Sequence, residues 1–207
     1  METLRLRGPR LTLREYRHTP EEAAALHAVH GDPATVRHLP FGPRDFEDCA
    51  DQLELYLEAA EEEPRTHYRL AVDDPAGEPV GQAALTREDG HAAQLGCVLR
   101  RDTWGRGYAA EATALLCALG FGTLGLYRLA ARCDPVNTAA VRVLERAGFQ
   151  YEGRIRADSH RDGRWHDALQ YALLAPEWSG PPWPGPPWPG PPRSGPGWPG
   201  PQGGPGG

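Results

Sequence analysis

Residues 94 to 111 constrain the fold of this chain more than any other stretch. They begin as an apolar run over 95 to 99, which predicts a buried strand. A charged turn at 100 to 102 follows, and then a segment at 104 to 109 that contains two glycines. Beyond it the sequence is rich in Ala and Leu, which favour a helix. The sequence therefore predicts a strand, a glycine-containing loop and a helix in direct succession.

This succession predicts an anion site at the start of the helix. The first turn of a helix has backbone N–H groups without intrahelical partners, and the helix dipole is positive there. Gly105 and Gly107 would let phosphate oxygens approach the main chain and can adopt a positive φ. Arg106 either adds charge or is simply solvated. The loop lacks the Gly-Lys-Ser/Thr of a P-loop and the GxGxxG of a dinucleotide site. We therefore expect it to bind the phosphate of a ligand that belongs to neither of these two classes.

The loop resembles the acyl-CoA pyrophosphate loop of the GNAT N-acetyltransferases, whose pattern is Gln/Arg-x-x-Gly-x-Gly/Ala. Trp104 occupies the first position of that pattern, Gly107 the fourth and Ala109 the sixth. The form Trp-Gly-Arg-Gly-Tyr-Ala is similar to the RimJ/RimL-like branch, the ribosomal-protein N-terminal acetyltransferases.

Two further stretches support this resemblance. Residues 134 to 149 resemble the branch's motif Asn-x-x-Ser-x-x-Val-Leu-Glu-Lys-x-Gly-Phe, with Arg146 in place of the lysine. Residues 163 to 178 resemble its C-terminal strand and ending. The resemblance covers residues 8 to 178, with three matches in the family's order. The matching residues of the second motif are Asn137, Val143, Leu144, Glu145, Gly148 and Phe149.

The resemblance implies an α/β (α+β) fold with a mixed sheet, the GNAT acyl-CoA N-acyltransferase fold, and acetyl-CoA as co-substrate. In that fold the pantetheine arm pairs with the strand at 95 to 99 and faces the strand at 129 to 133. The backbone of Cys97 and Val98 is expected to polarise the acetyl carbonyl. Asn137 is expected to hold the far end of the arm; its alternative role is a turn residue or helix N-cap. The implied cofactor-binding residues are Cys97, Val98, Leu99, Trp104, Gly105, Arg106, Gly107, Tyr108, Ala109 and Asn137.

Two departures from the family leave the catalytic residues unassigned. The serine thought to approach the departing thiolate is Ala140 here, and Gln94 stands where relatives often carry Glu. Proton removal through water is compatible with both. The remaining candidates for a base have no distinguishing spacing: Glu15, Glu88, His91 and His166.

Cys97 raises the alternative of an acyl-enzyme mechanism, because the thiol lies on the strand implied to flank the thioester. A free Cys has a pKa of about 8.5, and an apolar strand raises it further. No His or Lys lies among residues 95 to 99 to activate the thiol. We therefore expect direct attack by the amine in a ternary complex.

Composition excludes several other classes of protein. The 207 residues carry a net charge of −6, which disfavours binding to nucleic acid, although a local basic group at 100, 101 and 106 can hold one small polyanion. The four cysteines show neither CxxC spacing nor a His cluster, so we expect reduced thiols, no metal and a cytoplasmic protein. No apolar run is long enough for a membrane span or a secretion signal.

Periodicity predicts the remaining elements. Thr19 is expected to cap a helix that begins at Pro20. The glutamates of a helix at 45 to 63 form a solvated face or attract a cationic acceptor. Residues 156 to 167 are expected to form a loop. Strands are predicted at 11 to 16, 68 to 72, 79 to 85, 93 to 99, 129 to 133, 150 to 155 and 168 to 174, and further helices at 109 to 123 and 137 to 147.

After Trp178 the composition changes to Pro, Gly and Trp almost exclusively, with a Gly-Pro-Pro-Trp-Pro repeat. We expect an acetyltransferase domain at residues 1 to 178 and a disordered tail at 179 to 207 with polyproline II character. The tail either has no specific role or is a ligand for an aromatic groove of a partner.

The sequence therefore predicts acetyl transfer from acetyl-CoA to a primary amine, either a protein N-terminal α-amine or the amine of a small molecule. The alternative is a catalytically degenerate module of the same fold that binds acyl-CoA or docks a partner, for which Gln94 and Ala140 are the evidence. Acceptor, acyl length and oligomeric state are not specified by any of these patterns.

Overall fold

A computed structural model describes residues 4–88 and 90–180 of the chain. The expectation of a disordered tail therefore falls almost entirely outside the described residues. Within them, no helix is long and apolar enough to cross a membrane.

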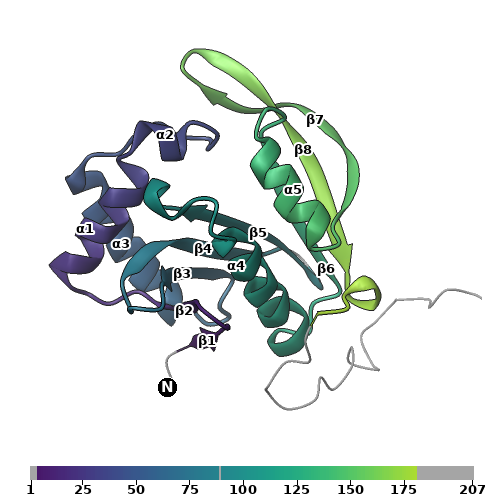
Figure 1. The fold of residues 1–207 in the computed structure, drawn as a ribbon, viewed down its shortest axis with the longest axis horizontal. Helices are drawn as coiled ribbons and strands as arrows, with labels where there is room; N and C mark the ends of the chain where they lie inside the picture. Colours follow the sequence, from purple (N-terminus) through teal and green to yellow (C-terminus); the bar gives the residue numbers. More distant parts are fainter. Residues whose placement is uncertain (1–3, 89, 181–207) are drawn as a thin grey trace, which may run out of the picture.

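Eight strands form one mixed sheet in the order β1-β2-β3-β4-β5-β6-β8-β7 (Figure 1). Each neighbouring pair is antiparallel except β5 and β6, which run parallel. The mixed α/β fold predicted from the sequence is confirmed. The strands are β1 (Arg5–Arg7), β2 (Thr12–Glu15), β3 (His67–Asp73), β4 (Pro79–Arg87), β5 (Ala92–Leu99), β6 (Arg128–Cys133), β7 (Gln150–Arg161) and β8 (Arg164–Leu174).

Helices cover both faces of this sheet. Alternate residues of β3 point to opposite faces: Ala71 packs with α1 and α3, whereas Leu70 and Val72 belong to the larger core that includes α4 and α5. Figure 1 shows α1 to α3 grouped on one side of the molecule and α5 with β7 and β8 on the other. The helices are α1 (Pro20–His30), α2 (Pro33–Val36), α3 (Phe46–Glu61), α4 (Tyr108–Cys117) and α5 (Thr138–Arg146).

The two parallel strands separate soon after they meet. Their pairing runs only from Ala92 opposite Arg128 to Gln94 opposite Ala130. Past that point β5 stays paired with β4 as far as Leu99, and β6 stays paired with β8 as far as Cys133. Within residues 4–88 and 90–180, one edge of residues 95 to 99 is therefore without a strand partner. This opening lies toward the carboxyl ends of β5 and β6, where the chain enters the 104–109 loop and α5.

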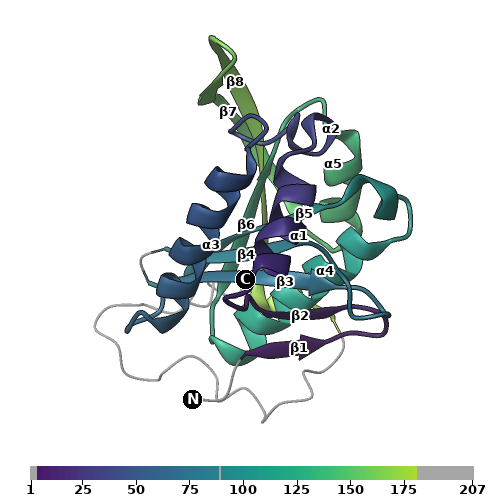
Figure 2. The same ribbon diagram turned by 90° about the vertical axis from the view of Figure 1, so that its left-hand side faces the viewer.

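The structure corrects the predicted loop at 156 to 167. These residues continue β7 and begin β8, which are joined at Asp162 and Gly163, both with positive φ. An Asp-Gly pair between two strands is a strong hairpin signal. The pairing with β8 is irregular between Ile155 and Ser159, where Ala157 has a φ of 53°. This irregularity interrupts the alternation of side chains along β7, so the sequence pattern does not indicate a strand there. The end of this hairpin extends beyond the rest of the sheet (Figures 1 and 2).

Three further differences concern short or irregular elements. β1 and α2 were not predicted, because both are too short to show a period. The helix predicted over 109 to 123 is an ordinary α-helix only to Cys117, and residues 118 to 123 form a wider π-helical turn. Gly120 packs closely on β6 in that turn: a Cβ there would lie 2.8 Å from Leu129 Cδ2.

Ending the chain after Gly180 should leave the folded body unchanged. Trp178 belongs to that body, because its ring packs on Phe121 with 5.5 Å between the centroids. The residues that follow have a composition that cannot bury a core. We expect the melting temperature of the shortened chain to stay within about 2 °C of the full chain, by scanning calorimetry. A fall of several degrees would show that the tail docks on the body.

Candidate active site

The loop at 104 to 109 has the conformation that its two glycines allow. Gly105 has a φ of 77° and Gly107 a φ of 78°, values that residues with a side chain seldom adopt. Gly107 is also the N-cap of α4, and no side chain in the described part of the chain caps the N–H groups of the first turn. The positive end of α4 and several main-chain donors therefore remain available at this loop.

Arg10 and Glu111 hold the loop against the turn that joins β1 and β2. The Glu111 carboxylate accepts hydrogen bonds from the main-chain N–H groups of Arg10 and Leu11, at 2.7 and 2.8 Å, and from Arg10 Nε at 2.9 Å. Arg10 Nη1 donates to the Arg106 carbonyl at 2.7 Å. The guanidinium also lies over the ring of Tyr108, 5.2 Å from its centroid. This clamp fixes the position of the loop relative to the β1–β2 turn.

Trp104 ties the loop to the end of β5. Its Nε1 donates to the Leu99 carbonyl at 2.8 Å, while 44% of the residue remains exposed. Arg100 pairs with Asp102 across the preceding turn, at 2.7 Å from Nε to Oδ1. Arg106 makes no side-chain hydrogen bond or ion pair among the described residues, so both of its expected roles remain open.

Only alternate residues of β5 direct their main-chain groups into the opening. Arg100 N donates to the Val80 carbonyl, and Glu88 N donates to the Ala92 carbonyl. These two bonds identify the hydrogen-bonded residue pairs at the two ends of the β4–β5 ladder. Because such pairs alternate along an antiparallel ladder, Val98 bonds to β4 and Cys97 directs its N–H and C=O toward the opening.

Cys97 itself is poorly suited to nucleophilic attack. Its side chain packs against the main core, and burial raises the pKa of the thiol to about 12. A thiol with that pKa is almost fully protonated at neutral pH.

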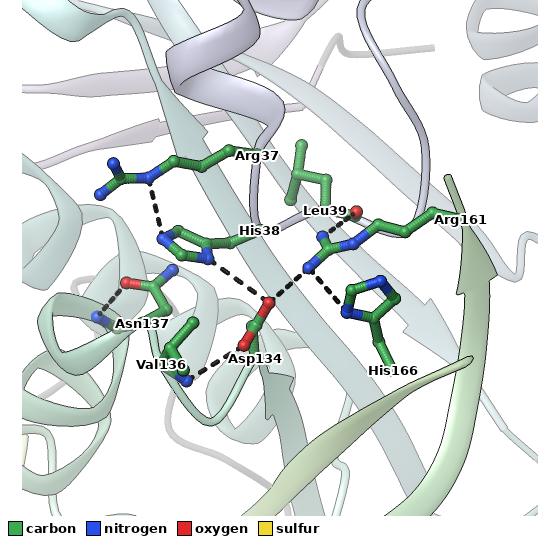
Figure 3. A network of polar contacts seen from close by, with 9 residues as sticks. Arg37, His38, Leu39, Asp134, Val136, Asn137, Arg161 and His166 are labelled. Carbon is green, nitrogen blue, oxygen red and sulfur yellow. Dashed lines mark hydrogen bonds and ion pairs between the residues drawn. The ribbon is translucent and has the colours of Figure 1, made fainter. Parts of the chain in front are cut away.

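Asn137 takes the N-cap position of α5. Its Oδ1 accepts a hydrogen bond from Ala140 N at 3.1 Å, which leaves the Nδ2 group free to donate. The N-cap role considered as an alternative is therefore present, and it is compatible with a second contact through Nδ2. Figure 3 shows the amide nitrogen of Asn137 directed toward the ring of His38.

The four candidates for a base are dispersed. Glu15 pairs with Arg65 on β2, three strands from β5. Glu88 accepts a hydrogen bond from Gln94 Nε2 at 2.7 Å. Glu88 and His91 both come just before the first residue of β5, whereas the 104–109 loop follows the other end of that strand. Among the four, His166 alone joins a polar cluster near Asn137 (Figure 3).

That cluster, the Asp134 network, joins three parts of the chain that are distant in sequence. Asp134 Oδ2 accepts from Arg161 Nη2 at 2.5 Å and contacts His38 Nδ1 at 3.4 Å. Arg161 also donates to the Leu39 carbonyl at 2.7 Å and lies 3.3 Å from His166 Nδ1. Burial alone would raise the pKa of Asp134, but hydrogen bonds from Val136 N–H, Arg161 and His38 outweigh it and lower the pKa. The carboxylate is therefore ionised at neutral pH.

Within the described part of the chain, no group of three His, Cys, Asp or Glu residues could hold a metal ion. All four cysteines are free thiols.

Glu111→Gln should destabilise the protein in a manner that depends on pH. Burial alone would raise the pKa of Glu111, but the hydrogen bonds from Arg10 and Leu11 together outweigh it and lower the pKa from its ordinary value. A lowered pKa means that the contribution is present above the unfolded-state pKa and is lost as pH falls through the folded-state value. We expect a deficit of about 2 kcal/mol at pH 7 in urea unfolding, shrinking steadily toward pH 3. A deficit that is constant with pH would contradict this.

Comparison with known proteins agrees with the geometry. The family described as Acetyltransferase (GNAT) domain matches residues 10–150. The uncharacterized N-acetyltransferase p20 of Bacillus licheniformis is 30% identical over 184 residues, which cover 87% of this chain and 100% of that protein. The chain therefore belongs to the GNAT acetyltransferase family, whose enzymes transfer acetyl groups from acetyl-CoA to amines.

Solved structures of the RimJ/RimL-like branch share the fold. Mycobacterium smegmatis RimJ, solved with CoA-disulfide, superposes with a TM-score of 0.70 at 24% identity and covers 84% of this chain and 88% of its own. RimL, a ribosomal L7/L12 alpha-N-protein acetyltransferase, superposes with a TM-score of 0.72 at 20% identity, covering 83% and 94%. The resemblance noted in the sequence is thus confirmed for the family and the fold, while the domain limits of 1 and 178 stay a prediction.

Proposed function

We propose that this protein binds acetyl-CoA with its pyrophosphate on the 104–109 loop and transfers the acetyl group directly to a primary amine. One observation carries the proposal: the uncapped start of α4 and the unpaired edge of β5 meet at the same end of the sheet. A ligand with an anionic end and an extended arm matches both features.

The residues around the opening then have separate roles. The loop from Trp104 through Gly105, Arg106, Gly107 and Tyr108 to Ala109 holds the pyrophosphate. The pantetheine arm pairs with β5 at Cys97 and Leu99, and Asn137 Nδ2 donates to its far end. The Cys97 N–H is directed into the opening and is placed to polarise the acetyl carbonyl. The Val98 backbone, expected from the sequence to share this role, is not available for it, because its main-chain groups bond to β4.

The acceptor is a primary amine, and a protein N-terminus is favoured. RimL, which shares this fold, is described as an alpha-N-protein acetyltransferase. The free thiols of the chain suit the cytoplasm, where we place the reaction. The test is acetyl transfer to a panel of short peptides with free or blocked N-termini and of small amines, followed by mass spectrometry. If no member of the panel is acetylated, the proposal is overturned. If only the small amines are acetylated, the acceptor is a small amine and not a protein N-terminus.

Cys97→Ala should retain turnover within about tenfold, a change of at most about 1.4 kcal/mol in the barrier. The reason is the raised thiol pKa, which leaves almost no thiolate for an acyl-enzyme step. Initial-rate plots with both substrates should intersect. Parallel lines, or an acetyl group trapped on Cys97, would show a covalent intermediate instead.

A further inference from the structure

None of the roles assigned so far supplies a proton acceptor for the amine. A primary amine is mostly protonated at neutral pH, and it must lose a proton before it can attack a thioester. Gln94 has no carboxylate, Ala140 has no hydroxyl, and the Cys97 thiol, with its pKa raised to about 12, is protonated. The carboxylates of Glu15 and Glu88 are engaged by Arg65 and Gln94.

His38 and Asp134 form a pair of the kind that serves as a base. His38 Nδ1 faces Asp134 Oδ2 at 3.4 Å, and their side chains are 18% and 9% exposed. Arg161 Nη2 and the Val136 N–H anchor the carboxylate from its other sides. A fixed, ionised carboxylate on one ring nitrogen holds an imidazole in one orientation and one tautomer.

Arg37 shows which ring nitrogen is the acceptor. Its Nε donates to His38 Nε2 at 2.9 Å, so Nε2 carries the lone pair and Nδ1 carries the hydrogen that faces Asp134. The position next to His38 Nε2 is therefore taken by a cationic N–H donor, the Arg37 guanidinium. An alkylammonium is also a cationic N–H donor, and it can take the place of the exposed Arg37 side chain.

The pair also lies beside the opening between the parallel strands. Asp134 directly follows β6, and its carbonyl accepts from Asn137 N at 2.9 Å in the turn that leads into α5. His38 comes from the segment after α2 and lies next to Asn137 (Figure 3). The same turn thus carries the residue assigned to the pantetheine arm and the carboxylate that orients His38.

We infer that His38, oriented by Asp134, is the general base of the reaction, an inference that rests on the proposed function. His38 Nε2 takes one proton from the acceptor ammonium. The neutral amine attacks the acetyl carbon, forming the C–N bond. The C–S bond then breaks, and the second amine proton passes through water to the departing thiolate. Imidazolium returns its proton to solvent, so the products are the amide, CoA thiol and one released proton.

Two charged groups contact His38 directly: Arg37 on its own segment and Asp134 in the β6–α5 turn. Arg161 at the end of β7 reaches His38 only through Asp134, and His166 on β8 only through Arg161. If the network had only a structural role, it would hold the β7–β8 hairpin against the segment at 37 to 39 and take no part in proton transfer. The two roles differ in their dependence on pH.

The test compares His38→Gln and His38→Ala with the wild type across pH 6 to 10, using the best acceptor of the panel. We expect kcat to fall about a hundredfold at pH 7 with CoA affinity unchanged, and to recover at high pH, where the amine is already neutral. Added imidazole should raise the rate of the folded His38→Ala variant. His160→Gln, an exposed histidine of the hairpin, is the matched control and should keep the wild-type profile.

A folded His38→Gln enzyme with the wild-type kcat and pH profile would overturn this inference while leaving the proposed function intact. A loss that persists at high pH and is accompanied by weaker CoA binding would also overturn it, because that outcome indicates a brace. Wild-type enzyme that acetylates no amine would overturn both.

Discussion

Replacing Gly107 with Val is expected to weaken acetyl-CoA binding by at least about a hundredfold, which corresponds to roughly 2.7 kcal/mol. Gly107 has a φ of 78°, and a β-branched residue strongly avoids that conformation. The main chain must therefore turn away and remove the donors at the start of α4 from the pyrophosphate. Isothermal titration calorimetry with acetyl-CoA measures the change.

Gly77→Val is the matched control for this strain. Gly77 has a φ of 82°, and a Cβ there would meet nothing within 4 Å. It lies in the turn between β3 and β4, outside the 104–109 loop. Both variants should lose similar stability, but only Gly107→Val should lose affinity. Equal affinities of the two variants would contradict the placement of the pyrophosphate.

Arg14→Leu should destabilise the fold by about 3 to 5 kcal/mol. Arg14 bridges two acidic residues in the interior: its Nη2 lies 2.6 Å from Glu22 Oε1 and its Nε 2.7 Å from Asp73 Oδ2. All three side chains are 5% exposed. Removal of the cation leaves two buried carboxylates without their partner, which is more costly than the loss of the ion pairs themselves. Urea unfolding at pH 7 measures the difference.

Arg5→Leu is the control for that substitution, because Arg5 lies opposite Arg14 in the β1–β2 pairing but is exposed. We expect a change below about 0.5 kcal/mol there. Adding Glu22→Leu and Asp73→Leu to Arg14→Leu should restore part of the lost stability, since no buried charge then remains. A small loss in the single variant would mean that water reaches the two carboxylates.

The sequence predicted best those features that depend on neighbouring residues. The succession of β5, glycine loop and α4 follows from an apolar run, two glycines and a helix-forming stretch, and it is present. The cap at Thr19 is present as well, with Pro20 as the first helical residue. The two strands of the β7–β8 hairpin were predicted, but their extension through residues 156 to 167 was missed, because a local irregularity at Ala157 breaks the alternation on which strand prediction depends.

The parts of the site that the sequence did not predict are contacts between distant residues. Arg10 and Glu111 are 101 positions apart, and His38 and Asp134 are 96 apart. Neither pair has a spacing that a single sequence can reveal, since folding alone brings them together. The residue types alone offered a weak signal: Asp134 begins the stretch at 134 to 149 but lies ahead of the motif residue Asn137, and His38 belongs to no pattern.

The most direct test of this account is hydrogen exchange of the full chain with and without saturating acetyl-CoA. Bound cofactor should slow the exchange of amides at 97 and 99, on the open edge of β5, and at 105 to 109, at the start of α4. Amides of β1 to β3 should exchange as before. Protection confined to other elements, or no protection of the 105 to 109 amides at saturation, would contradict the claim that acetyl-CoA lies on this loop and along this strand.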